Sequence, residues 1–190
     1  MNTSLAARQR REGFFYLAAF AATIPLANWM IGNLGTVCPP ESPCLIPVGP
    51  GLMAPSGVLM IGAALVLRDL VQRRLGLYWA IAAILVGGAL SGFVAPPALV
   101  VASVAAFLLS EFADLAVYTP LQKRGLVTAV VASSVVGLVV DSAIFLQLAF
   151  GDLSYIWGQI VGKGWMVLLA IPLIQWFRRR EERLGLEVPA

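Results

Sequence analysis

The chain has 190 residues, of which 59% are hydrophobic and only 12% are charged, and its mean hydropathy is +0.87. A soluble domain carries about 25% charged and roughly 45–50% apolar residues. This composition excludes a soluble globular enzyme, a disordered chain and a nucleic-acid-binding domain, and it predicts one integral membrane domain over residues 1–190. The absence of histidine excludes histidine-based zinc, nucleophile and haem chemistry.

Six apolar stretches are long enough to form transmembrane helices. A helical span needs about 20 predominantly apolar residues, and charged residues, glycine or proline bound each stretch. We therefore predict an all-α membrane protein of six transmembrane helices. The first stretch exceeds the usual apolar region of a signal peptide, so we interpret it as a retained helix. The predicted spans are residues 14–31, 51–67, 77–95, 97–118, 126–150 and 155–177.

The basic residues indicate the orientation of these spans. Cytoplasmic loops of membrane proteins retain Lys and Arg. Twelve of the thirteen basic residues precede the first span or follow the second, fourth and sixth spans, whereas residues 32–50, 95–97 and 150–154 contain none. We therefore expect both termini in the cytoplasm. The net charge of +3 is then a topology signal and not a nucleic-acid site.

Residues 32–50, between the first two spans, contain both cysteines and five prolines. Proline disfavours a helix and favours a stiff turn. Cys38 and Cys44 are too few for a metal cage but sufficient for one disulfide in an oxidising external compartment. The sequence favours this disulfide over two free thiols without deciding between them.

Two segments of the chain share the same order of features. Each has an apolar helix, a basic turn that ends in a glycine, and a second apolar helix. The two glycines, Gly76 and Gly125, are 49 residues apart. This order is compatible with a duplicated helical hairpin, although apolar sequences also resemble one another by chance.

Four ionisable residues lie inside predicted spans, where a charge is costly. Glu111 and Asp114 lie in the fourth span, Asp141 in the fifth and Lys163 in the sixth. Each charge at mid-bilayer costs roughly 2.5–3.5 kcal/mol, so we expect these groups to share a polar cavity between helices. The alternative is a structural ion pair between Lys163 and one carboxylate, and the two interpretations can coexist.

Helical spacing extends this polar set, because residues three, four or seven apart share a face. Tyr118 shares a face with Glu111 and Asp114, and Gln159 shares one with Lys163. Asp69 either extends the set or forms an interfacial pair with Arg68. We predict a substrate cavity lined by the fourth to sixth spans, with no catalytic residue, cofactor or metal. The candidate substrate-binding residues are Asn28, Glu111, Asp114, Tyr118, Asp141, Gln159, Lys163 and Trp165.

The hydrogen-bonding capacity of these groups favours a ligand with a guanine-like edge. Carboxylates accept hydrogen bonds, the Gln159 amide both donates and accepts, and Lys163 only donates. Adjacent N–H donors beside a carbonyl would match such a set, whereas an inorganic ion would not need the aromatic side chains. A carboxylate near a lysine can also exchange a proton with the cavity, which leaves proton coupling open.

Four short segments and Asn28 together match a known pattern. The segments are LVLRDLVQRRLG with Asp69, SEFADLAVYTPLQKRG with Glu111 and Asp114, GLVVDSAIF with Gly137 and Asp141, and GQIVGKGWMVLLAIP with Gln159, Lys163 and Pro172. At these residues, over about residues 14–177, the chain resembles the queuosine precursor transporter family, also called the VUT family. Many relatives have an amide where this chain has Glu111, and the Cys- and Pro-rich first loop is unfamiliar.

The resemblance implies a multi-pass protein of the cell inner (plasma) membrane that imports a 7-deazaguanine base such as preQ1 or preQ0. One alternative is a substrate-binding subunit, similar to an S component, that needs an energised partner. Another is an intramembrane enzyme with an aspartyl pair, which no accompanying motif supports. Whether the chain acts alone or as a homodimer stays open.

Overall fold

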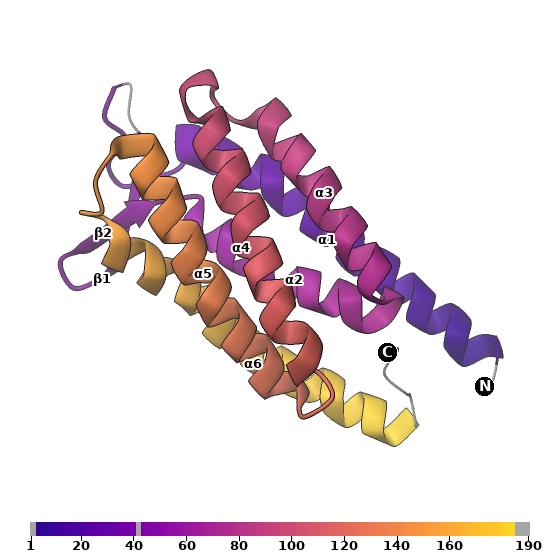
Figure 1. The fold of residues 1–190 in the computed structure, drawn as a ribbon. Helices are drawn as coiled ribbons and strands as arrows, with labels where there is room; N and C mark the ends of the chain where they lie inside the picture. The colour runs from indigo at the N-terminus through magenta and orange to yellow at the C-terminus, as the bar shows by residue number, and fades with distance from the viewer. Residues whose placement is uncertain (1–2, 41–42, 185–190) are drawn as a thin grey trace.

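The structure is a computed structural model that describes residues 3–40 and 43–184. It is a bundle of helices with a short β-hairpin at one end (Figure 1). In chain order the elements are α1 (Thr3–Asn33), β1 (Leu45–Gly49), β2 (Leu52–Pro55), α2 (Val58–Leu75), α3 (Leu77–Val94), a 3₁₀ turn (Pro97–Leu99), α4 (Val100–Leu121), α5 (Leu126–Phe150) and α6 (Ile156–Leu184).

Five of these helices are long and apolar enough to cross a membrane, judged by length and composition: α1, α3, α4, α5 and α6. They agree with five of the predicted spans and indicate a multi-pass membrane protein. The exception is α2, which is not among the candidate spans. The second span was predicted at residues 51–67. Residues 52–55 are instead a β-strand, and α2 runs on to Leu75 and carries four charged residues. The described residues thus form six α-helices, as predicted, and five of them are apolar candidate spans.

The position of α2 explains how it carries charge. It contacts each of the other five helices, so its side chains meet protein on most sides. Leu65 and Val66 of α2 pack with Tyr118 of α4, Val130 of α5 and Val167 of α6 in one hydrophobic cluster. Because the other helices surround α2, its polar groups lie inside the bundle and not against lipid.

The hairpin corrects the all-α prediction. Strands β1 and β2 pair antiparallel, with Leu45 opposite Pro55 and Ile46 opposite Ala54. The turn between them contains Gly51 at φ +69°, a conformation that favours glycine. The Cys38–Cys44 disulfide is formed, which confirms the favoured interpretation of the two cysteines.

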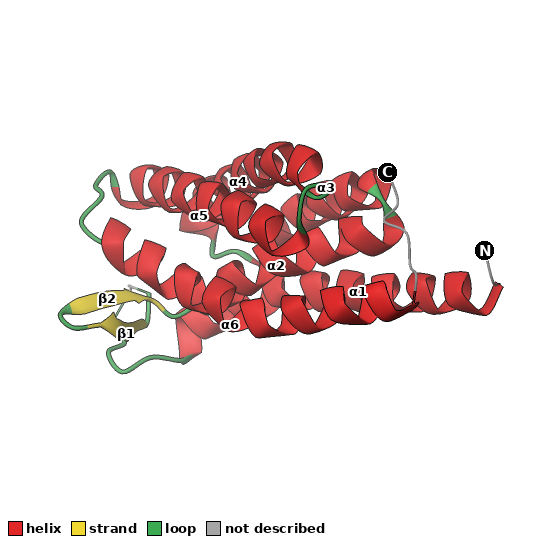
Figure 2. Cartoon of the chain, turned by 90° about the horizontal axis from the view of Figure 1, so that it is seen from below, coloured by secondary structure: helices red, strands yellow, loops and turns green. Residues whose placement is uncertain are grey.

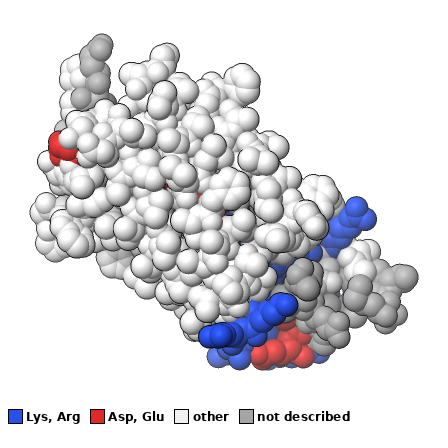
Figure 3. Space-filling view, in the orientation of Figure 1, with Lys and Arg blue, Asp and Glu red and all other residues white. Residues whose placement is uncertain are grey.

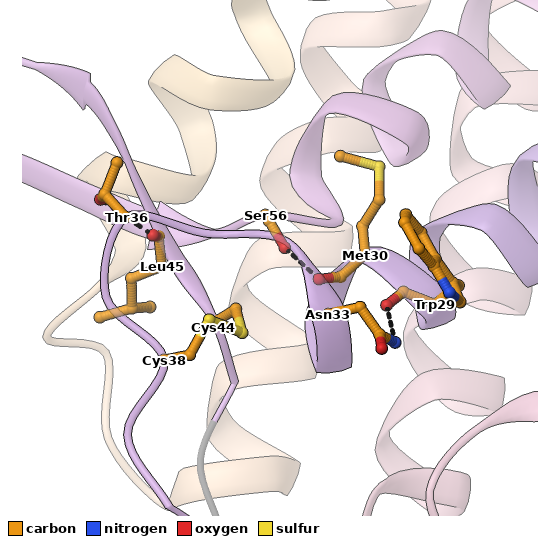
Figure 4. The surroundings of a disulfide bond; sticks show 8 residues. All are labelled: Trp29, Met30, Asn33, Thr36, Cys38, Cys44, Leu45 and Ser56. Atoms are coloured by element: carbon orange, nitrogen blue, oxygen red, sulfur yellow. Dashed lines mark hydrogen bonds between the residues drawn. A yellow bond between two sulfur atoms is a disulfide. The ribbon is translucent and has the colours of Figure 1, made fainter.

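The hairpin is attached to the C-terminal end of α1. The backbone N–H of Cys44 donates a hydrogen bond to the carbonyl of Ile31 at 2.8 Å. The hydroxyl of Ser56, just after β2, donates to the carbonyl of Met30 at 2.7 Å (Figure 4). The bond from Cys44 satisfies a carbonyl of the last helical turn, where helix carbonyls lack helical partners, and the Met30 carbonyl, which also accepts from the Leu34 N–H at 2.9 Å, gains a second donor. The disulfide-closed loop thus covers the end of α1.

The start of α1 and the end of α6 lie together at the opposite end of the molecule from the hairpin (Figures 1 and 2). There the rings of Tyr16 and Phe177 pack edge to face with centroids 5.6 Å apart, and Arg180 donates to Glu12 at 2.6 Å. On the face that Figure 3 shows, Lys and Arg gather at this end, while the middle of the bundle is almost free of charge.

Two arginines of α2 belong to the same end of the bundle. Arg73 and Arg74 were predicted to lie in a turn after the second span, but both lie in α2 and are buried. Arg73 binds Glu181 of α6 at 2.6 Å. Arg74 also binds Glu181, and it binds Glu12 of α1 at 3.1 Å. The helix continues past the predicted boundary because carboxylates of α1 and α6 compensate these charges.

Glycines allow α6 to approach α2 and the hairpin closely. A Cβ atom at Gly62 of α2 would lie 2.5 Å from the carbonyl oxygen of Lys163. A Cβ atom at Gly158 of α6 would overlap the carbonyl oxygen of Met53 in β2. A side chain at either position therefore requires the backbones to separate.

We predict that Gly158→Ala destabilises the protein, by about 1–3 kcal/mol as is typical of overpacking. The matched control is Gly164→Ala on the same helix, where a Cβ atom would meet no atom within 4 Å and alanine favours the helix. Thermal unfolding of the purified protein in detergent measures both variants. Equal melting temperatures for the two variants would contradict the close contact between α6 and β2.

Candidate functional site

Arg68 of α2 is the centre of a buried ionic cluster. Its side chain is fully buried, and its guanidinium contacts three carboxylates: Asp69 at 2.9 Å, Glu111 at 3.2 Å, and Asp114. The guanidinium also donates to the side-chain oxygen of Gln72 at 3.2 Å. One cation thus joins polar groups of α2 and α4, and we call Arg68, Asp69, Glu111 and Asp114 the Arg68 cluster.

A second set of contacts holds this cluster in place. The hydroxyl of Ser133 on α5 donates to Asp69 at 2.9 Å, and the Gln72 amide donates to the hydroxyl of Thr119 at 3.1 Å. The ring of Tyr118 lies 5.7 Å from the Arg68 guanidinium carbon, within the range of a cation–π contact. The cluster is therefore fixed from α2, α4 and α5.

Lys163 forms a separate ion pair. Its ammonium group is fully buried and lies 2.6 Å from an oxygen of Asp141. It donates two further hydrogen bonds, to Ser142 at 2.7 Å and to the side-chain oxygen of Gln159 at 2.5 Å. These three bonds use all the donors of the ammonium group. The ion pair that the sequence left as an alternative is thus present, between α5 and α6.

A cavity lies beside both groups of charges, in the half of the bundle nearer to the hairpin. Its polar lining includes Asn28 of α1, Glu111 of α4, Asp141 of α5 and Gln159 of α6. The cavity was predicted between the fourth, fifth and sixth spans, but α1 and α2 also form its walls. The other lining residues are mostly apolar or small: Ile24, Ala27, Ile31, Pro55, Val58, Met60, Ile61, Ala64, Ala106, Phe107 and Phe145, with Thr23, Ser91, Ser103 and Ser110.

Four of the eight candidate binding residues line this cavity, and the other four do not. Asp114 and Tyr118 contact Arg68, and Lys163 contacts Asp141 and Gln159. These three therefore position the cluster and the ion pair. Trp165 does not line the cavity. Its indole N–H donates to the carbonyl of Val48 in β1 at 2.8 Å, and its side chain is half exposed.

The two carboxylates and two amides of the lining offer mostly hydrogen-bond acceptors. Glu111 and Asp141 present carboxylate oxygens. Asn28 uses its amide N–H to donate to the carbonyl of Ile24 at 3.0 Å, which leaves its side-chain oxygen as an acceptor. Gln159 accepts from Lys163, which leaves its amide N–H as a donor. Among the described residues, no group of three or more Asp, Glu or Cys side chains is placed to hold a metal ion.

We predict that Lys163→Met destabilises the protein by about 3–5 kcal/mol, because it leaves the Asp141 carboxylate buried without its cation. The double variant Asp141→Asn/Lys163→Met should recover most of this loss, since neither charge remains. The control is Arg178→Met, which removes an exposed ion pair with Glu182 and should cost about 1 kcal/mol or less. Chemical unfolding in detergent measures all three, and a double variant as unstable as Lys163→Met would contradict the pairing.

The chain was compared with families and proteins of known identity. No curated protein and no solved structure matches it. Residues 89–177, from the last part of α3 to the apolar part of α6, match a family described as "Putative vitamin uptake transporter". This segment contains Glu111, Asp114, Asp141, Gln159 and Lys163. The resemblance to the vitamin uptake (VUT) transporter family, which includes the queuosine precursor transporters, is thereby confirmed over residues 89–177.

Proposed function

We propose that this protein imports a 7-deazaguanine base such as preQ1 or preQ0, and that the base binds in the cavity beside the Arg68 cluster. The observation that carries the proposal is the convergence of two carboxylates and two amides on one cavity inside an apolar bundle. A membrane protein that buries such groups without a use for them would bear their cost for no gain. The family match over residues 89–177 supports a transport activity, and the polar groups of the cavity support the class of ligand.

The polar groups of the cavity are complementary to a guanine-like edge. Such an edge presents adjacent N–H donors, which Glu111, Asp141 and the Asn28 oxygen accept. It also presents a carbonyl oxygen, which is the acceptor for the amide N–H of Gln159. Phe107 and Phe145 provide flat apolar walls for the ring. An acceptor-rich site also suits the amine of preQ1.

The proposed binding of the base depends on one of two asparagines of α1 and not on the other. Asn28 lines the cavity, whereas Asn33, near the helix end, is exposed and makes the same type of hydrogen bond to the carbonyl four residues earlier. We predict that Asn28→Ala and Asp141→Asn each weaken preQ1 binding by about tenfold or more, since a lost hydrogen bond costs about 1–3 kcal/mol when one partner is buried or charged.

Calorimetry of preQ1, preQ0 and guanine on the purified protein measures these affinities. Asn33→Ala and the surface variant Glu182→Gln serve as controls and should bind as the unmodified protein does. Proteoliposomes that contain the chain alone should take up radiolabelled preQ1, because a secondary carrier needs no ATPase. Wild-type affinity in both Asn28→Ala and Asp141→Asn would remove the cavity from the proposal. Binding without uptake would favour a substrate-binding subunit with an energised partner.

We also propose that both termini face the cytoplasm and that the hairpin faces the outside. The basic residues gather at the end where α1 starts and α6 ends (Figure 3), as expected for a cytoplasmic side. The Cys38–Cys44 disulfide suits the opposite, oxidising side.

This orientation predicts the behaviour of reporter fusions. A reporter that is fluorescent only when it folds in the cytoplasm should be active when fused after residue 190. A phosphatase that requires an oxidising compartment should be inactive at that position. It should be active when inserted in the turn between β1 and β2. The reverse pattern would contradict the proposed orientation.

A further inference from the structure

The buried charges of the Arg68 cluster do not balance. Lys163 and Asp141 form a pair of one cation and one carboxylate. Arg68, by contrast, contacts the three carboxylates Asp69, Glu111 and Asp114. If all three are ionised, the cluster carries two negative charges in excess. An uncompensated charge in a protein interior or a bilayer is strongly unfavourable.

The described elements around the cluster supply no further cation. From α5 the nearest charged group is Asp141, whose partner is Lys163 of α6. The remaining arginines of α2, Arg73 and Arg74, form their ion pairs with Glu181 and Glu12 at the end of the bundle, although the Nη1 atom of Arg73 is buried without a hydrogen-bond partner among the described residues. Where α1 and α3 border the cavity, they contribute polar but uncharged side chains: Thr23, Asn28 and Ser91.

An orphaned oxygen points to how the excess is compensated. The Oδ2 atom of Asp114 is buried and has no hydrogen-bond partner among the described residues. It faces α5, where a Cβ atom on Gly137 would lie 3.2 Å away. An ionised carboxylate requires hydrogen-bond donors at both oxygens when it is buried. The cluster has one cation, three carboxyl groups and a carboxyl oxygen that no donor contacts. Protonation of its carboxyl groups would therefore compensate the excess negative charge.

Glu111 connects the cluster to the cavity. It both contacts Arg68 and lines the cavity, whereas Asp69 and Asp114 do not line it. We propose that the Arg68 cluster is a proton-binding site that is loaded from the cavity through Glu111, and that its protons are carried together with the base. The second half of this proposal rests on the proposed import function.

The loading step balances in atoms and charge. A hydronium ion in the cavity transfers a proton to a carboxylate oxygen of Glu111, so that an O–H bond forms and a water molecule remains. The Arg68 guanidinium is then shared between Asp69 and Asp114 only. Return of the proton to water on the other side of the membrane restores the ionised carboxylate. Two bound protons would balance the charge of the cluster.

Infrared spectroscopy of the reconstituted protein without any base tests the proton site directly. The carbonyl stretching band of a protonated carboxylic acid should persist at neutral pH in the wild-type protein. Glu111→Gln reduces the excess from two charges to one, so the band should fall to about half. Asp69→Asn should act in the same way, which covers the case in which one variant does not fold. Glu182→Gln removes an exposed carboxylate and should leave the band unchanged.

Accumulation of preQ1 in proteoliposomes tests the coupling. A pH difference of one unit, acidic outside and with the membrane potential held at zero, corresponds to about 1.4 kcal/mol per proton. One proton per base then gives about tenfold accumulation of the base inside, and two give about a hundredfold. Glu111→Gln should lower the accumulation ratio at equilibrium, whatever its rate of uptake.

The two measurements separate failure of this inference from failure of the proposed function. If no base enters under any gradient, import of these bases is wrong, and the infrared band still decides whether the cluster binds protons. If preQ1 enters but stops at equal concentrations despite the pH difference, the coupling is wrong. A band that is absent at neutral pH, or unchanged in both Glu111→Gln and Asp69→Asn, would overturn the proton site.

Discussion

The enclosure of Arg68 by the other helices is the constraint on which the rest of the structure depends. A guanidinium stays charged in proteins, so burying it obliges the fold to surround it with acceptors. Glu111 and Asp114 of α4 must then face α2, and Ser133 of α5 must reach Asp69. The same requirement keeps α2 away from lipid, because it contacts all five other helices. The cavity lies where this polar layer meets the apolar walls of α1 and α4.

Charged residues inside apolar runs were the sequence feature that best predicted the buried polar groups. Glu111, Asp114, Asp141 and Lys163 stand out because apolar residues flank them on both sides, and all four are buried in ionic contacts. Four of the predicted helices also agree closely with the structure at their starts. A long apolar run that begins and ends at charge, glycine or proline leaves few alternatives to a helix.

Arg68 was not predicted as a site residue, because it is a charged residue that directly follows the apolar run of residues 51–67. In LVLRDLVQRRLG, the first charge was interpreted as the membrane boundary, although no residue before Gly76 breaks a helix. Arg68 and Gln72 are four apart and share a face, which could have extended the span. The sequence did not indicate the partners of Arg73 and Arg74, because Glu12 and Glu181 are far away in the chain. The hairpin was missed for a related reason, since Val, Ile and Leu around prolines fit a strand and an apolar helix end equally well.

Two ionic layers along α2 divide the bundle. Arg68 lies in one layer, and Arg73 and Arg74, five and six residues later, lie in the other, about 7.5–9 Å farther along the helix. The first layer borders the cavity, and the second joins α1, α2 and α6 at the end where the basic residues gather. Between the cavity and that end, the described residues thus form two successive sets of ion pairs. Well-packed apolar residues would often stabilise a bundle equally well or better. Under the proposed function, the first layer is kept because it borders the cavity, and the second is kept because it joins α1, α2 and α6.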